Sequence, residues 1–184
     1  MDLFRINKKR KIEIKKNQKY LNFGCGRDIR QGWVNCDMQK HPNIDKTFNF
    51  ETYPYPFKAN SFDYILLDNV LEHMVHPLNV LDELHRISKN GTLIKIIVPY
   101  FNCAGAYNDI THYHYFNRRT FEVMFSQNSC YDLNKEKKFK IHTLKLEPTL
   151  IGKFIPSFMR ELISMFIGTI IGSIDCEIKV LKKN

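Results

Sequence analysis

The sequence predicts an α/β fold built on a mostly parallel β-sheet. Strand-like and helix-like segments alternate along the 184 residues, which is the pattern of strands joined by crossover connections. The length suits one domain. With 43% hydrophobic and 26% charged residues, the composition is typical of a globular protein with a packed core.

Short apolar segments bounded by turn residues predict the strands. In the first half of the chain they are residues 19–23, 33–36, 46–50, 62–67 and 92–98. Two more strands are predicted late in the chain, at residues 139–146 and 174–181. The first strand runs into a glycine loop and the second ends at an aspartate.

One helix is predicted between the strands at 62–67 and 92–98. Pro77 suits its first turn, and Val80, Leu84 and Ile87 form an apolar stripe at helical spacing. The Asn90-Gly91 pair is expected to end this helix, because asparagine and glycine are common at helix C-termini.

Residues 148–173, between the two late strands, predict a partly helical apolar cap. This segment is rich in Leu, Ile, Phe and Met but is interrupted by glycines and prolines. It is longer than an ordinary loop of about 4–6 residues. Three interpretations remain open: packing on the protein's own sheet, a dimer contact, or contact with a membrane or a lipid-linked acceptor.

Charge and cysteine content narrow the functional classes. Residues 1–20 hold eight Lys or Arg residues and two acidic residues, so much of the net charge of +9 belongs to a basic N-terminal arm, residues 1–18. Such an arm can contact nucleic acid or anionic lipid, but it is more often a solvated tail.

The five cysteines have no C-x-x-C spacing, so no metal site is expected, and their scattered positions suit reduced thiols in the cytoplasm.

No targeting or membrane-spanning segment is expected. The N-terminus lacks the apolar stretch of a secretory signal. The longest charge-free apolar run, residues 162–174, is shorter than the roughly 20 residues of a membrane span.

Two features predict a nucleoside-binding site. The segment LNFGCG ends an apolar strand at Gly24-Cys25-Gly26, where backbone can approach a ligand closely. Asp37 then closes GWVNCD, where a carboxylate can accept both hydroxyl groups of a ribose. Ile29 stands where the last glycine of a G-x-G-x-x-G motif would be, which argues against NAD or FAD but not against a cofactor without a pyrophosphate.

Two polar segments follow later strands. FDYILLDNVLEHM brings Asp68, Asn69, Glu72 and His73 to the same edge of the sheet; the alternative is a solvated helix start capped by Asp68. AYNDITHYHYF follows the fifth strand, and its Asp109, His112 and His114 are candidate catalytic residues. Asp109 paired with either histidine could act as a base; equally, these groups could only shape a lid.

The order and spacing of four blocks resemble the class I S-adenosylmethionine-dependent methyltransferases. The blocks are LNFGCG, GWVNCD, YPYPFKANSFDYILLDNVLEHM and LDELHRISKNGTLIKIIVP, within residues 20–99, and a looser match continues to about residue 125. The resemblance is to compact members with a shortened first helix. It implies a Rossmann-like, seven-stranded, mostly parallel sheet with an antiparallel last strand, and S-adenosyl-L-methionine as cofactor.

The resemblance also implies roles for individual residues. Gly24 and Gly26 would contact the methionine part of the cofactor, Asp37 would bind the ribose, and Asn49 and Phe50 would lie beside the adenine. The full set of expected cofactor-binding residues is Asn22, Gly24, Cys25, Gly26, Asp37, Met38, Asn49, Phe50, Asp68, Asn69 and His73. The sequence departs from the family at Asn49, where an aspartate is frequent, and at Ile110, where a proline is common.

The expected function is methyl transfer to a small-molecule or glycan-type acceptor. Two alternatives remain open. The basic arm and several aromatic residues favour an RNA methyltransferase, although no dedicated RNA-binding module precedes the motifs. The departures at Asn49 and Ile110 favour a non-catalytic protein that has kept the cofactor-binding fold.

Overall fold

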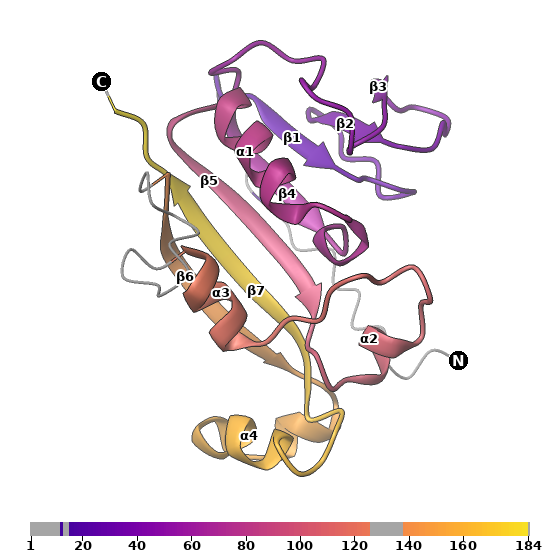
Figure 1. Cartoon of the computed structure of the whole chain (residues 1–184), viewed down its shortest axis with the longest axis vertical. Helices are drawn as coiled ribbons and strands as arrows, with labels where there is room; N and C mark the ends of the chain where they lie inside the picture. The colour runs from indigo at the N-terminus through magenta and orange to yellow at the C-terminus, as the bar shows by residue number, and fades with distance from the viewer. Residues whose placement is uncertain (1–11, 13–14, 126–137, 184) are drawn as a thin grey trace.

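Seven strands form one sheet in the order β3-β2-β1-β4-β5-β7-β6 (Figure 1). The computed structural model describes residues 12, 15–125 and 138–183. Strands β1 to β5 pair in parallel, and β7 is antiparallel to both of its neighbours, β5 and β6. This arrangement confirms the predicted fold class.

The predicted strands are all present, within a few residues at their ends. They are β1 Tyr20–Phe23, β2 Val34–Asp37, β3 Lys46–Thr47, β4 Phe62–Asp68, β5 Ser88–Pro99, β6 Phe139–Pro148 and β7 Ile171–Val180. The helices are η1 Leu71–His73, α1 Pro77–Ile87, α2 Ala104–Tyr107, α3 Arg118–Phe125, η2 Ile151–Phe154 and α4 Ser157–Ser164. The predicted basic arm lies mostly outside the described residues, as does Cys130.

Helix α1 begins at Pro77 as predicted, but the expected end at Asn90-Gly91 is wrong. The helix ends at Ile87, and Ser88 follows it in extended conformation as the first residue of β5. The Ser88 hydroxyl donates to the Leu84 carbonyl at 2.7 Å and so satisfies one of the free carbonyls of the last turn. Gly91, with a φ of +84°, lies inside β5, where the pairing with β4 changes register.

The main core lies between the sheet and helices α1 and α3, which cover the face seen in Figure 1. Ile65 and Leu67 of β4 and Ile94 and Ile96 of β5 point to this face and are fully buried. The alternation along each strand puts one set of side chains on this face and the next set on the other. A single cluster of buried apolar residues results, and it contains the α1 stripe predicted from the sequence.

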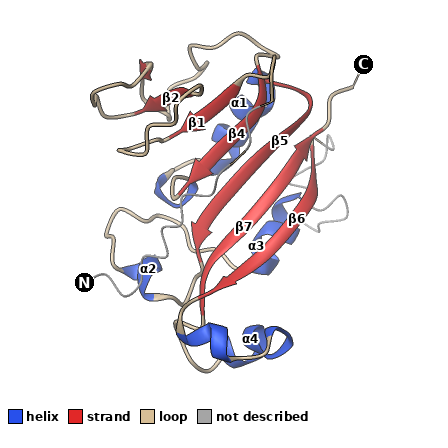
Figure 2. Ribbon diagram, turned by 180° about the vertical axis from the view of Figure 1, so that it is seen from behind, coloured by secondary structure: helices blue, strands red, loops and turns tan. Residues whose placement is uncertain are grey.

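The opposite face, seen in Figure 2, carries no helix among the described residues. The connections between β1 and β2, residues 24–33, and between β2 and β3, residues 38–45, are loops. For the first of these connections the sequence predicted a shortened helix. A small cluster of Tyr20, Trp33, Leu66 and Ile97 lies on this face, with Ile12 packed against it. Farther along the sheet this face is polar, and Lys95 pairs with Asp175 at 3.1 Å.

Residues 148–173 contain the two helices η2 and α4, so the cap is partly helical as predicted. Most of its large apolar side chains are exposed: Leu150, Ile151, Phe154, Phe158, Met159, Leu162, Met165, Phe166 and Ile167. Ile170 and Ile171 are buried, and Ile155 and Ile163 pack against the main core. The interpretation of the cap as ordinary core is therefore wrong for the exposed side chains. In the described part of the chain no helix has the length and apolar character of a membrane span.

Candidate active site

The ends of four neighbouring strands bring the predicted site residues to one edge of the sheet. Strand β1 leads to Gly24, β2 ends at Asp37, β4 ends at Asp68, and β5 leads into residues 100–116. These strands are parallel, so their carboxyl ends share this edge. Ligands of open α/β sheets bind there.

The glycine loop packs against the protein at Gly24 but leaves free space at Gly26. Gly24 and Gly26 have φ values of +70° and +50°, which favour glycine. The amides of Gly24 and Cys25 both donate to the Cys36 carbonyl, which ties the loop to β2. A Cβ at Gly24 would lie 2.5 Å from Val70 Cγ2, whereas a Cβ at Gly26 would have no atom within 4 Å. A ligand can therefore approach the backbone at Gly26.

The Asp37 carboxylate lies beside this open position. Its Oδ2 accepts a hydrogen bond from the Gly26 amide at 2.7 Å, and its Oδ1 accepts one from the Gln39 amide at 2.9 Å. Each carboxylate oxygen can accept two hydrogen bonds, and the residue is partly exposed. Asp37 can thus accept ribose hydroxyls while it holds Gly26 in place.

Two of the expected cofactor residues have buried side chains with other partners. Asn22 Nδ2 donates to the Asp28 carbonyl at 2.7 Å and to Asn35 Oδ1 at 3.1 Å. The Phe50 ring stacks on Phe23, with ring centroids 3.9 Å apart. If Asn22 and Phe50 contact the cofactor, they do so through their backbones.

Three other expected cofactor residues lie near the edge. Cys25 is buried and burial raises its pKa to about 11, so it remains a thiol at neutral pH. Met38, which follows β2, is 46% exposed. Asn49, which follows β3, is exposed, and its Oδ1 accepts a hydrogen bond from the Glu51 amide. Met38 and Asn49 are therefore accessible to a ligand, and their predicted roles remain predictions.

Asp68 and Asn69 form the turn that leaves β4. Asn69 has a φ of +54°, and its Nδ2 donates to Asp68 Oδ1 at 2.9 Å. The helix η1 that follows has Val70 at its N-cap and no side-chain capping bond. Asp68 is therefore not a helix cap, and the alternative interpretation of this segment does not hold.

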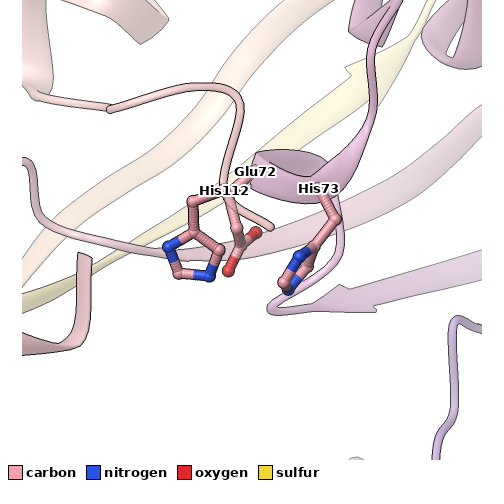
Figure 3. A group of neighbouring side chains, drawn as sticks. All are labelled: Glu72, His73 and His112. Carbon is pink, nitrogen blue, oxygen red and sulfur yellow. The ribbon is translucent and has the colours of Figure 1, made fainter. Parts of the chain in front are cut away.

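Glu72, His73 and His112 form a compact cluster next to this turn (Figure 3). One ligand atom of each residue lies within 4.8 Å of the other two. Glu72 and His73 belong to η1, and the Glu72 carbonyl accepts hydrogen bonds from the amides of Tyr113 and His114 at 2.8 and 3.3 Å. These backbone bonds hold residues 112–114 against η1.

Burial changes the protonation of this cluster. Desolvation raises the pKa of Glu72 to about 8, and the nearby charges of Asp68 and Asp109 act in the same direction. Both Glu72 carboxylate oxygens are buried without a hydrogen-bond partner among the described residues. For His73, desolvation lowers the pKa, and the proximity of His112 lowers it further.

The predicted pairing of Asp109 with His112 or His114 is not formed. Asp109 Oδ1 instead accepts hydrogen bonds from the amide and hydroxyl of Thr111, at 2.9 and 2.7 Å. His112 Nδ1 lies 2.8 Å from the Ala106 carbonyl, and His114 Nε2 lies 3.4 Å from the Val75 carbonyl. Asp109 is exposed. Its carboxylate accepts hydrogen bonds from Thr111, two residues along the chain, instead of pairing with a histidine across the loop.

Sequence reasoning placed Glu72 at the correct edge but gave it no role. It separated His73, assigned to the cofactor, from His112, assigned to catalysis. His73 and His112 are brought together with their ring centroids 4.6 Å apart. The available signal was an acidic residue next to a histidine directly after a buried strand, followed by a second histidine-rich segment after the next strand.

Comparison with known proteins shows a similarity that lies mainly in the first half of the chain. Residues 17–96 match a family described as a methyltransferase domain. The chain is also 34% identical over 105 residues to an uncharacterized protein of Methanocaldococcus jannaschii. That match covers 48% of this chain and 44% of the relative, so the chain spans under half the length of the curated relative that it matches.

Solved structures share the fold at low sequence identity. A SAM-dependent methyltransferase from Archaeoglobus fulgidus has a TM-score of 0.59 at 13% identity, over 87% of this chain and 86% of that one. A complex of the Haloferax volcanii Trm112 methyltransferase activator with a candidate methyltransferase gives 0.62 at 13%, over 93% and 85%. The [4+2]-cyclase SpnF gives 0.60 at 14%, over 90% and 75%. At such identities the similarity shows the fold alone.

Proposed function

We propose that this chain, which has the class I methyltransferase fold and a methyltransferase domain at residues 17–96, transfers a methyl group from S-adenosylmethionine to a small-molecule or glycan-type acceptor. The main support is the edge formed by Gly26 and Asp37. An open glycine and a partly exposed carboxylate, joined by a hydrogen bond of 2.7 Å, suit a nucleoside cofactor that has no pyrophosphate.

The residues at this edge fit the parts of such a cofactor. Asp37 would accept the ribose hydroxyls, and Gly26 leaves room for the methionine part beside the backbone. Asn49 can donate a hydrogen bond through its exposed amide, or accept one through its Oδ1, next to the adenine. Asp68 and Asn69, at the end of β4, would border the sulfur and the methyl group.

The reaction needs alignment more than acid or base catalysis. When bound, S-adenosylmethionine supplies a methyl group activated as a sulfonium; the acceptor atom forms the new bond to carbon while the C–S electron pair stays on sulfur. Residues of this chain would hold the acceptor in line, which is the main contribution of a binding site to such a step. Residues 100–116, which follow β5, would line the acceptor pocket.

Transfer of labelled methyl groups tests this function. Purified protein is incubated with methyl-labelled S-adenosylmethionine and with separate metabolite, glycan, lipid and RNA fractions of the source cells. We expect label in the metabolite, glycan or lipid fraction, and none in RNA. Label in RNA, together with RNA affinity that falls steeply with salt and disappears when residues 1–16 are deleted, would support the RNA methyltransferase instead. Tight cofactor binding with no label in any fraction would support the non-catalytic alternative.

The apolar cap favours an acceptor that carries a lipid or lies at a membrane surface. It lies next to the end of β5, because Asn102 accepts a hydrogen bond from the Thr169 amide at 3.1 Å and donates to the Ser164 carbonyl. The Arg118–Glu161 ion pair, at 2.9 Å, also joins the cap to α3. An exposed apolar surface beside the acceptor segment, with the exposed Lys153 among its side chains, suits an anionic bilayer.

We expect the chain to sediment with vesicles that contain anionic lipid, and the triple variant Phe154→Ser/Phe158→Ser/Phe166→Ser to lose at least about tenfold in vesicle affinity. These rings are 82–90% exposed, so their removal should not unfold the protein. Each ring would contribute about 1.5–3 kcal/mol when buried in lipid. Light scattering that shows a dimer in the wild type and a monomer in the variant, without vesicle binding, would instead identify the cap as a dimer contact.

A further inference from the structure

The Glu72–His73–His112 cluster has the chemistry of a metal site. One ligand atom of each residue lies within 4.8 Å of the others, and Figure 3 shows the Glu72 carboxylate between the two imidazole rings. Glu72 is 1% exposed, and both of its carboxylate oxygens lack a partner in the described part of the chain. A buried carboxyl group without a hydrogen-bond partner either holds a proton or needs a nearby cation to neutralise its charge.

Hydrogen bonds fix both imidazoles in the form that binds metal through Nε2. The Ala106 carbonyl can only accept, so His112 Nδ1, at 2.8 Å, carries the proton. The Thr111 hydroxyl donates its one proton to Asp109 Oδ1 at 2.7 Å. Thr111 Oγ1 can therefore only accept from His73 Nδ1, which lies 2.9 Å away and carries the proton. On each ring Nε2 is then left with a free lone pair.

These outer contacts resemble those that accompany metal-binding histidines in proteins. A ligating histidine almost always donates its other N–H to a carboxylate, a backbone carbonyl or a water molecule. Here His112 donates to a backbone carbonyl, and His73 donates to a hydroxyl that is itself bonded to the carboxylate of Asp109.

We propose that Glu72, His73 and His112 bind one divalent transition-metal ion. Two imidazole nitrogens and one carboxylate favour zinc, iron, cobalt, nickel or manganese over magnesium and calcium, which prefer oxygen ligands. Ligand atoms about 2.1 Å from a tetrahedral ion lie roughly 3.4 Å apart. The ion would therefore draw the three side chains together from their separation of up to 4.8 Å.

A role for this ion in methyl transfer rests on the proposed function. Three protein ligands leave coordination positions open, as in catalytic zinc sites. An acceptor hydroxyl bound at such a position would lose its proton more easily. The ion would thus help to deprotonate the acceptor, the role that the sequence assigned to an Asp109–histidine pair.

Metal titration of the full chain, free of any histidine tag, tests the proposal. Protein stripped with chelator and dialysed is titrated with Co²⁺, Zn²⁺ and Mg²⁺, with cobalt absorbance, calorimetry and elemental analysis as readouts. We expect one cobalt or zinc ion per chain and no magnesium. Glu72→Gln and His112→Ala should each weaken binding at least about 10–100-fold, the range already caused by loss of an outer-shell partner.

Two further variants separate a metal site from a structural cluster. Thr111→Val keeps the side-chain shape but removes the hydroxyl that orients His73, so it should weaken metal binding by about 10–100-fold. His142→Ala, which removes an exposed histidine of β6 far along the chain from the cluster, should leave metal binding unchanged.

The proposal is overturned if the wild type binds no cobalt or zinc, or if Glu72→Gln and His112→Ala both bind metal as tightly as the wild type. Glu72→Gln has the shape of the wild-type residue; should it fail to fold, the His112→Ala titration decides. Cofactor binding is measured separately by calorimetry with S-adenosylhomocysteine. A chain that binds the cofactor but no metal refutes this inference alone, and one that binds metal but no cofactor refutes the proposed function alone.

Discussion

Asp37→Ala should raise the dissociation constant for S-adenosylhomocysteine by at least about 100-fold. The reason is the loss of two charge-assisted hydrogen bonds to ribose hydroxyls, each of about 1.5–3 kcal/mol. In the wild type the Gly26 amide donates to Asp37 at 2.7 Å, so the substitution would also remove an anchor of the glycine loop. Calorimetric titration of the wild type and the variant measures the effect.

Two control variants show whether the carboxylate itself binds the cofactor. Asp37→Asn keeps an oxygen for the Gly26 amide but loses the charge, so its affinity should fall between those of the wild type and Asp37→Ala. Asp45→Ala removes a nearby carboxylate that accepts from the Asn35 amide, and it should leave cofactor affinity largely unchanged. Wild-type affinity in a folded Asp37→Ala protein would exclude this residue from the site.

Alanine substitutions at the two loop glycines should affect different properties: Gly24→Ala mainly the stability of the protein, and Gly26→Ala mainly its affinity for the cofactor. Gly24→Ala should destabilise the protein by about 2–4 kcal/mol, because an alanine at a φ of +70° is strained and its Cβ would lie 2.5 Å from Val70. Gly26→Ala meets no protein atom within 4 Å, so it should cost only about 1–2 kcal/mol in stability. Its Cβ would, however, enter the space assigned to the cofactor and weaken binding.

Urea unfolding and calorimetry separate these two effects. The double variant Gly24→Ala/Val70→Ala should recover part of the stability lost by Gly24→Ala, because it removes the side chain that the new Cβ would meet. A Gly24→Ala protein as stable as the wild type, or a Gly26→Ala protein with undiminished cofactor affinity, would contradict this description of the loop.

The sequence predicted the sheet well because its strands are short apolar segments with clear ends. The parallel core from β1 to β5 follows from such local patterns, and the antiparallel ending followed from the family resemblance. The end of α1 was predicted wrongly because two signals compete there. Asn90-Gly91 suits a helix end, but Ser88 already closes the helix and pairing with Phe62 begins at that residue.

The cofactor edge was more predictable than the acceptor side. Gly24, Gly26 and Asp37 reach this edge directly from the ends of strands, so their positions follow from strand order. The orientations of His73 and His112 depend instead on Thr111 and the Ala106 carbonyl. Such contacts depend on the path of a loop, which hydrophobic periodicity does not describe.

Calorimetric titration of the purified chain with S-adenosylmethionine and S-adenosylhomocysteine, with NADH as comparison, tests the central claim most directly. The Gly26–Asp37 edge predicts binding of both methionine-derived ligands with dissociation constants of micromolar order, about −8 kcal/mol. It predicts no binding of NADH, because Ile29 stands in the third glycine position of the pyrophosphate-binding motif. A chain that binds NADH and neither of the two other ligands would contradict the claim.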